Sequence, residues 1–150
     1  MQMELETPVG WLTVTERDGQ ITRLSWGRAE ETGASPLLTE ACEQLVAYFA
    51  GDLEDFDLQL APGGSALQQA VCQVMSAIPF GETRTYGDIA KELNMPAQAI
   101  GQACGGNPIP VIIPCHRALG ANGLGGFSRG TGIETKVALL RHEGAAGLLI

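Results

Sequence analysis

The sequence has few of the residues that build metal centres or disulfide frameworks. Its 150 residues include four cysteines and two histidines, and no two cysteines are spaced as a CxxC pair. Zinc sites and disulfide scaffolds need such residues in larger and more closely spaced groups. We therefore expect four reduced thiols and no metal site.

Long apolar runs are also missing. No stretch approaches the roughly 20 apolar residues of a membrane-spanning helix, and residues 1–6 have neither the basic start nor the apolar run of a secretory signal. The expected location is the cytoplasm, with no membrane partner. A chain of this length can bury roughly 70% of its unfolded surface, so it can fold as one domain or as two small ones.

Positive charge is scarce and unevenly distributed. The chain has nine Lys and Arg against seventeen Asp and Glu, for a net charge of −8. Residues 1–65 contain twelve acids and three arginines, whereas residues 66–150 contain five acids and six bases. Because phosphate binding depends on cationic surface, any DNA-binding face is expected in the second part, and its binding should be weak and sensitive to salt.

The first third of the chain predicts strands followed by a helix. Residues 10–16 and 20–26 favour β-structure, and Asp18-Gly19 between them is a two-residue hairpin signal. A helix is then expected from the N-cap Ser35 to the stop at Gly51. Its apolar stripe, which includes Cys42 as a small core residue, consists of Leu37, Leu38, Ala41, Cys42, Leu45, Val46 and Phe49.

The second part is predicted to be mainly helical and to follow a linker over residues 51–64. After a first helix, on which Cys72 is expected to pack, residues 86–93 and 97–104 have the outline of a helix-turn-helix. The second of these two helices consists almost entirely of small side chains. Such a helix can approach a groove closely, although tight packing against a neighbouring helix would explain the same composition.

An apolar run bounded by prolines, residues 109–114, leads directly into Cys115-His116-Arg117. We expect this run to be extended and Cys115 to lie at the end of a rigid strand. Nine of the twenty glycines lie between Gly101 and Gly132, which is typical of unusual backbone geometry or close approach to a ligand. Residues 131–134 match a capping box, and this pattern predicts where the last helix begins.

Cys115 is the candidate nucleophile. The thiolate is the reactive form of cysteine, and neighbouring imidazole and guanidinium groups favour it. His116 can act as the base, and Glu143, at the end of the last helix, can orient the imidazole. Spacing alone leaves open the alternative that Cys115 is an ordinary buried cysteine.

Five motifs between Leu67 and Gly144 occur in an order that is typical of one family. They are residues 78–83 (IPFGET), 86–90 (YGDIA), 106–108 (GNP), 109–120 (IPVIIPCHRALG), and Lys136 followed by 142–144 (HEG). This part of the chain resembles the O6-alkylguanine-DNA alkyltransferases, or methylated-DNA–protein-cysteine methyltransferases. The resemblance implies DNA repair by direct, stoichiometric transfer of an alkyl group to Cys115 without a cofactor. The group would come from O6 of guanine, with O4 of thymine as a further candidate.

The resemblance implies a role for each matching residue. Cys115 would accept the alkyl group, His116 would deprotonate it through a water, and Glu143 would hold the imidazole. Asn107 would bridge the turn that presents the cysteine, while Tyr86 would help to extrude the nucleotide and would protonate the departing guanine. Contacts to DNA or to the guanine would come from Gln98, Ala99, Cys104, Arg117, Ala118, Phe127 and Ser128.

Two positions depart from the family pattern. Gln98 stands where an arginine usually fills the gap left by the flipped base, and glutamine lacks the charge and reach of arginine. We therefore expect repair to persist with weaker binding to duplex DNA. Phe127 stands where a tyrosine is common and keeps the aromatic wall without its hydroxyl.

The predicted fold is α+β. An N-terminal subdomain, residues 1–60, would have a small antiparallel sheet with a helix of ribonuclease-H-like type. A mainly helical C-terminal domain, residues 65–150, would contain the helix-turn-helix. The expected partner is double-stranded DNA containing O6-alkylguanine, bound by a monomer.

Three alternatives are open. The first is a non-catalytic protein that recognises alkylated DNA, although proteins of that kind lack the cysteine found at position 115 here. The second is a Cys-His hydrolase or acyltransferase, which would not explain Asn107 or the helix-turn-helix. The third is a DNA-binding regulator, which the acidic composition disfavours.

Overall fold

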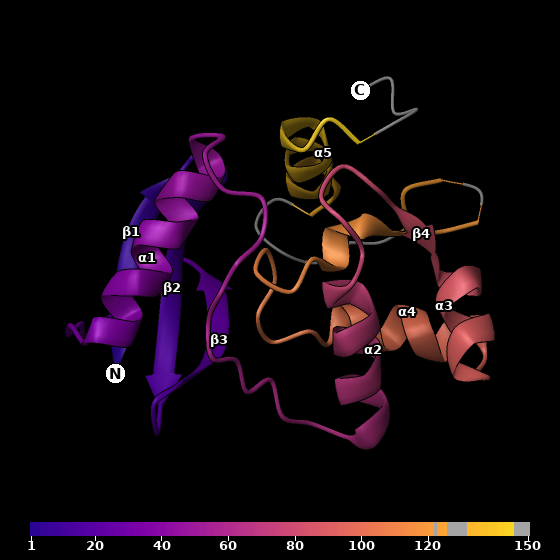
Figure 1. The fold of residues 1–150 in the computed structure, drawn as a ribbon, viewed down its shortest axis with the longest axis horizontal. Coiled ribbons are helices and arrows are strands. Elements are labelled where there is room, and N and C mark those ends of the chain that lie inside the picture. The colour runs from indigo at the N-terminus through magenta and orange to yellow at the C-terminus, as the bar shows by residue number, and fades with distance from the viewer. Residues whose placement is uncertain (122, 126–131, 146–150) are drawn as a thin grey trace. The chain divides into compact units, whose positions relative to one another are not determined.

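The computed structural model describes residues 1–121, 123–125 and 132–145, and the chain divides into two units after Pro62. The first unit consists of strands β1 (Gln2–Thr7), β2 (Gly10–Arg17) and β3 (Gln20–Trp26) and helix α1 (Pro36–Phe49). The strands form one antiparallel sheet in the order β1-β2-β3, and α1 packs on it (Figure 1). This is the predicted sheet with a helix, enlarged by β1, which the sequence analysis does not predict.

The β2–β3 hairpin confirms the signal at Asp18-Gly19. Both residues have positive φ, 54° and 76°, as a two-residue turn of this kind requires. The turn closes the pair Arg17–Gln20, and the register continues to Leu12 opposite Trp26 with one irregularity after Thr15.

Helix α1 begins as predicted, with the Ser35 hydroxyl accepting a hydrogen bond from the Leu38 amide at 3.0 Å. Its buried residues are Leu38, Ala41, Leu45 and Tyr48. The predicted stripe is therefore wrong along one edge, because Val46 is 60% exposed and Cys42 is only half-buried. Each of these two residues follows a buried residue, Ala41 or Leu45. One further residue along an α-helix rotates the side chain by about 100°, which points it away from the sheet.

The predicted linker is shorter than residues 51–64. Ile21 of β3 donates its amide to the Gln59 carbonyl and accepts from the Ala61 amide, both at 2.8 Å. Residues 59–61 thus pair with β3 as a parallel bridge and belong to the first unit.

The second unit is mainly helical, as predicted. Its helices are α2 (Ala66–Ser76), α3 (Tyr86–Leu93), α4 (Ala97–Gly105), α5 (Ile133–His142) and a short 3₁₀ helix, η1 (Cys115–Arg117). Two short strands, β4 (Arg84–Thr85) and β5 (Ala118–Leu119), pair in parallel. Helices α3 and α4 form the predicted helix-turn-helix (Figure 1), and the left-handed residue Asn94 ends α3.

The starts of α3 and α5 differ from the sequence patterns. Helix α3 has a capping box that the sequence analysis does not identify, in which Thr85 and Asp88 bond each other's backbone amides at 3.0 Å. The capping box predicted at 131–134 is wrong, because the N-cap of α5 is Gly132, with no side-chain hydrogen bond. Gly132 has φ 73° and ψ −128°, a conformation that glycine adopts without strain. Thr131 itself lies outside the described residues.

Among the helices of the described ranges, none combines the length and apolar character needed to cross a membrane.

The stability of the first unit should depend on the buried face of α1. Leu45→Ala removes a side chain with no exposed surface and should lower the free energy of unfolding by about 3 kcal/mol. Val46→Ala, one residue later but 60% exposed, should change it by less than about 0.5 kcal/mol. Chemical denaturation of both variants checks this, and equal losses would contradict the placement of the two side chains.

Candidate active site

The segment before Cys115 is a series of tight turns, not the predicted extended strand. The Ile113 amide donates to the Ile109 carbonyl at 2.9 Å, and the Cys115 amide donates to the Ile113 carbonyl at 2.8 Å. Val111 has φ 71°, a strained value for a β-branched residue. The segment is apolar because it is buried, from Ile109 through Ala118, and its prolines cannot donate to a sheet ladder.

Asn107 holds these turns closed. Its Nδ2 donates to the Ile113 carbonyl at 2.8 Å, and its Oδ1 accepts from the Ile109 amide at 3.0 Å. Asn107 has no exposed surface. Cys72, which is a buried residue of α2 as predicted, lies beside it with its sulfur 4.0 Å from Oδ1. Because Asn107 follows α4 directly, it joins the end of that helix to the turn that carries Cys115.

His116 and Glu143 are in contact, and Cys115 precedes His116 in η1. His116 Nε2 lies 2.8 Å from Glu143 Oε2, and neither side chain has exposed surface. Because a carboxylate can only accept, Nε2 carries the hydrogen and Nδ1 is left as an acceptor. Nδ1 is buried and has no hydrogen-bond partner among the described residues. Burial is the main cause that lowers the pKa of His116, so the imidazole is neutral and able to accept a proton.

Arg117 is buried rather than placed on a DNA-facing surface. Its Nε and Nη2 donate to the two oxygens of Glu143 at 2.8 and 2.9 Å, and Nη1 donates to the Ile78 carbonyl at 2.6 Å. The side chain is 6% exposed. This geometry argues against the DNA contact expected for Arg117.

Tyr86 lies within electrostatic range of Cys104 and Cys115. It is the first residue of α3, and Gly125 leaves room for its ring and hydroxyl. A Cβ on Gly125 would lie 2.9 Å from the hydroxyl, whereas a Cβ on Gly101 would make an ordinary contact with the ring at 3.7 Å. Burial raises the pKa of Tyr86, and the nearby Cys104 and Cys115 raise it further.

Lys136 is a site residue for which the sequence analysis gives no role. It has no exposed surface, donates to the Ala118 carbonyl at 2.7 Å, and lies 5.8 Å from the centre of the Tyr86 ring. Burial lowers its pKa to about 8, while Cys115 and Cys104 act in the opposite direction. The sequence signal for its burial is helical spacing. Positions 136, 139, 140 and 143 lie on one face of α5 and its C-cap, and all four are buried.

Cys104 and Ala118 are both buried close to these groups. The Cys104 sulfur lies 3.4 Å from Met75 Sδ, and burial raises the pKa of the Cys104 thiol to about 12. It is therefore a neutral thiol, chemically distinct from a nucleophile. Ala118 already uses both backbone groups, its amide toward Cys115 and its carbonyl toward Lys136. A guanine contact at Ala118 would need the second lone pair of that carbonyl.

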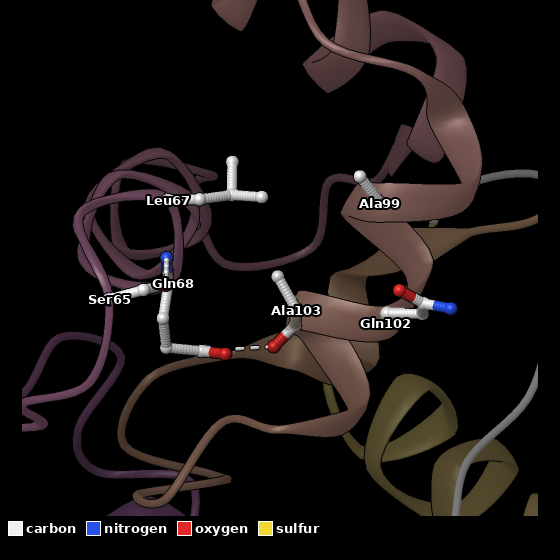
Figure 2. Close-up of a pocket in the computed structure, with 6 residues that line it drawn as sticks. All are labelled: Ser65, Leu67, Gln68, Ala99, Gln102 and Ala103. Carbon is white, nitrogen blue, oxygen red and sulfur yellow. Dashed lines mark hydrogen bonds between the residues drawn. The ribbon is translucent and has the colours of Figure 1, made fainter.

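A groove of about 220 Å³ runs between the start of α2 and the exposed side of α4 (Figure 2). Gln68 Nε2 donates to the Ala103 carbonyl at 2.8 Å and fixes the two helices together. Gln98 is exposed and Ala99 half-buried, so α4 presents both residues that were expected to contact DNA. The groove is lined by Ser65, Leu67, Gln68, Ala99, Gln102 and Ala103.

Phe127 and Ser128 lie outside the described residues. Within the described part of the chain, no three His, Cys, Asp or Glu side chains are grouped so as to hold a metal ion. The geometry is that of a thiol with a buried histidine–carboxylate pair, joined through Asn107 to a helix-turn-helix.

Comparison with known families agrees with this geometry. Residues 66–145 match the DNA-binding domain model of 6-O-methylguanine DNA methyltransferase, and residues 4–62 match its ribonuclease-like domain model. The chain belongs to the 6-O-methylguanine DNA methyltransferase family.

Individual relatives cover most of the chain. A methylated-DNA–protein-cysteine methyltransferase of Methanosarcina acetivorans is 47% identical over 81% of this chain and 75% of its own length. One of Mycolicibacterium paratuberculosis is 41% identical over 93% and 89%. The crystal structure of Mycobacterium tuberculosis OGT in complex with DNA aligns with a TM-score of 0.83 at 40% identity, over 94% of this chain and 91% of that one.

Lys136 should make stability depend on pH. Between about 8 and its ordinary value of 10.5, the unfolded chain binds a proton at this lysine that the folded chain does not. The free energy of unfolding should therefore rise with pH across this range. Denaturation of Lys136→Met at several pH values should lack that part of the rise, whereas Lys91→Met, at an exposed position on α3, should keep it. The same pH dependence in both variants would contradict the burial of a titrating Lys136.

Proposed function

We propose that this chain repairs double-stranded DNA by moving an alkyl group from O6 of guanine to Cys115 in a single turnover. O4 of thymine is a second candidate donor. The family and its relatives support a methylated-DNA–protein-cysteine methyltransferase. The observation that carries the assignment of Cys115 is the adjacent His116–Glu143 pair, buried and joined at 2.8 Å, with Nδ1 of His116 open as an acceptor.

The reaction follows from these groups. His116 Nδ1 takes the Cys115 proton through a water, while Glu143 holds the Nε2 hydrogen and stabilises the imidazolium that forms. The thiolate attacks the alkyl carbon, a C–S bond forms, and the C–O bond breaks with its electron pair passing to the guanine. Tyr86 supplies a proton to the leaving base. The thioether has no easy leaving step, so each molecule acts once, without a cofactor.

Lys136 supports the same reaction electrostatically. Its ammonium lies close to the Tyr86 ring and within the field of Cys104 and Cys115. A cation there stabilises negative charge on the attacking thiolate and on a tyrosine that has given up its proton.

The target carbon cannot be reached in a stacked duplex, so the nucleotide must rotate out into the site. Helix α4 suits this task because it exposes Gln98 and Gln102, and between them only Ile100 is large, with no exposed surface. We assign Gln98 to the gap that the flipped nucleotide leaves in the duplex. We assign the groove residue Gln102 to the adjoining DNA backbone. Guanine contacts by Phe127 and Ser128, a monomeric state and a cytoplasmic location remain predictions.

Mass spectrometry after incubation with a duplex containing O6-methylguanine tests the proposal. One methyl group should appear on the Cys115 peptide, the DNA should regain unmodified guanine, and no second turnover should follow. Cys115→Ser should abolish transfer. Cys104→Ser should retain it, because that thiol stays protonated. Binding without transfer would instead indicate a protein that only recognises the lesion, and repeated turnover would indicate a different enzyme.

Charge placement predicts how DNA binding responds to salt. Helices α2 and α4 contain no charged residue. Arg117 and Lys136 are buried, and Arg84 binds Glu92 at 2.8 Å. With so few cations available, log K against log salt should have a slope no steeper than about −3. This is a shallower dependence than the sequence analysis predicts.

Gln98→Arg should tighten binding and steepen that slope by about 0.9, the contribution of one added phosphate contact. Fluorescence anisotropy of a labelled duplex, with Cys115→Ser in every protein to prevent reaction, measures both quantities. Gln20→Arg, which adds the same charge at the exposed β2–β3 turn, is the matched control. An equal effect of both substitutions would contradict the assignment of Gln98 to the DNA interface.

A further inference from the structure

Arg117 is fixed between two elements that flank the reactive turn. It binds the carbonyl of Ile78, just beyond α2, and both oxygens of Glu143, at the C-cap of α5. Its guanidinium carbon also lies 5.8 Å from the centre of the Phe80 ring. With donors on all three nitrogens in use and a side chain 6% exposed, Arg117 can act on the reaction only through the groups that it holds.

The group that Arg117 holds at two points is the carboxylate that orients the base. Glu143 Oε2 accepts from both His116 Nε2 and Arg117 Nη2, and Oε1 accepts from Arg117 Nε. A buried carboxylate is costly unless a cation compensates it, and a two-point contact with arginine does so at fixed geometry. Because Arg117 supplies the compensating charge, His116 does not need to be protonated.

The charged groups that face His116 are few. Glu143 and Lys136 come from α5, Arg117 comes from η1 itself, and α2, which also packs on η1, has no charged side chain. Glu143 favours the protonated imidazole, while the two cations oppose it. Loss of one cation would therefore leave the carboxylate to draw a proton onto His116 Nδ1, the atom that must accept one.

We propose that Arg117 is a positioning residue for alkyl transfer, which keeps Glu143 compensated so that His116 stays neutral with Nδ1 open. This inference deepens the proposed function and rests on it. It replaces the expected role of Arg117 at the DNA surface.

The pH dependence of the single-turnover rate distinguishes this role from simple support of the fold. Removing a cation beside His116 raises its pKa. In Arg117→Met, the acid limb of the rate profile should therefore move to higher pH by about one unit or more, and the rate should recover at alkaline pH. Arg117→Lys keeps the charge without the two-point contact and should shift the limb less. Arg28→Met, which removes an arginine paired with Glu4 in the first unit, should leave the profile unchanged.

Nitrogen NMR of the two histidines in the free protein makes the test independent of DNA. His116 should hold its hydrogen on Nε2 and stay neutral in the wild-type chain, and it should titrate at higher pH in Arg117→Met. If transfer itself fails in the wild-type protein, this measurement still decides the role of Arg117. A rate that falls equally at every pH, with unchanged titration of His116, would overturn the proposal. If Arg117→Met does not fold, Arg117→Lys decides it by the same two measurements.

Discussion

The site depends on one buried carboxylate. Glu143 has no exposed side-chain surface, yet it binds His116 and Arg117 at 2.8 to 2.9 Å. These contacts join the end of α5 to η1, and through Arg117 to the Ile78 carbonyl beyond α2. Because an unpaired charge would be costly here, the carboxylate fixes the tautomer of His116 and the position of the turn that begins with Cys115. The end of α5, η1 and the segment beyond α2 are thereby joined at the turn that carries Cys115.

Asn107 supplies the second constraint, which connects chemistry to recognition. The side-chain amide of Asn107 closes the turns before Cys115. The residue itself follows α4 with no helix or strand between them. Asn107 therefore links the end of α4 to the turn that carries Cys115. The same helix contains no charged residue. In the proposed function, its contact with DNA therefore relies on close approach and on amide hydrogen bonds more than on phosphate neutralisation, which is compatible with an acidic chain.

Local patterns predict most of the elements, whereas the partners of buried polar groups cannot be predicted from local sequence. Asp18-Gly19 acts through its own backbone, and Ser35 caps a helix within three residues of itself. Such signals are local, so sequence alone places them. The apolar run at 109–114 predicts a strand because burial and β-structure favour the same composition. The turns found there are held by Asn107, which lies outside the run. Arg117 follows Cys115 by two residues, and the family resemblance places it at the DNA. Nothing local indicates that its partner is Glu143, 26 residues away. The burial of Lys136 can be inferred only from its spacing along α5, where it shares a face with other buried residues.

The rate of methyl transfer by Glu143→Gln, measured in a single turnover with a duplex containing O6-methylguanine, tests the central claim most directly. The amide has the same shape but carries no charge, and it can offer a donor to His116 in place of an acceptor. The account predicts a loss of about 100-fold or more, the usual contribution of a positioned base, in a chain that remains folded. A folded variant whose rate stays within a few-fold of the wild type would contradict the view that the site is organised around this carboxylate.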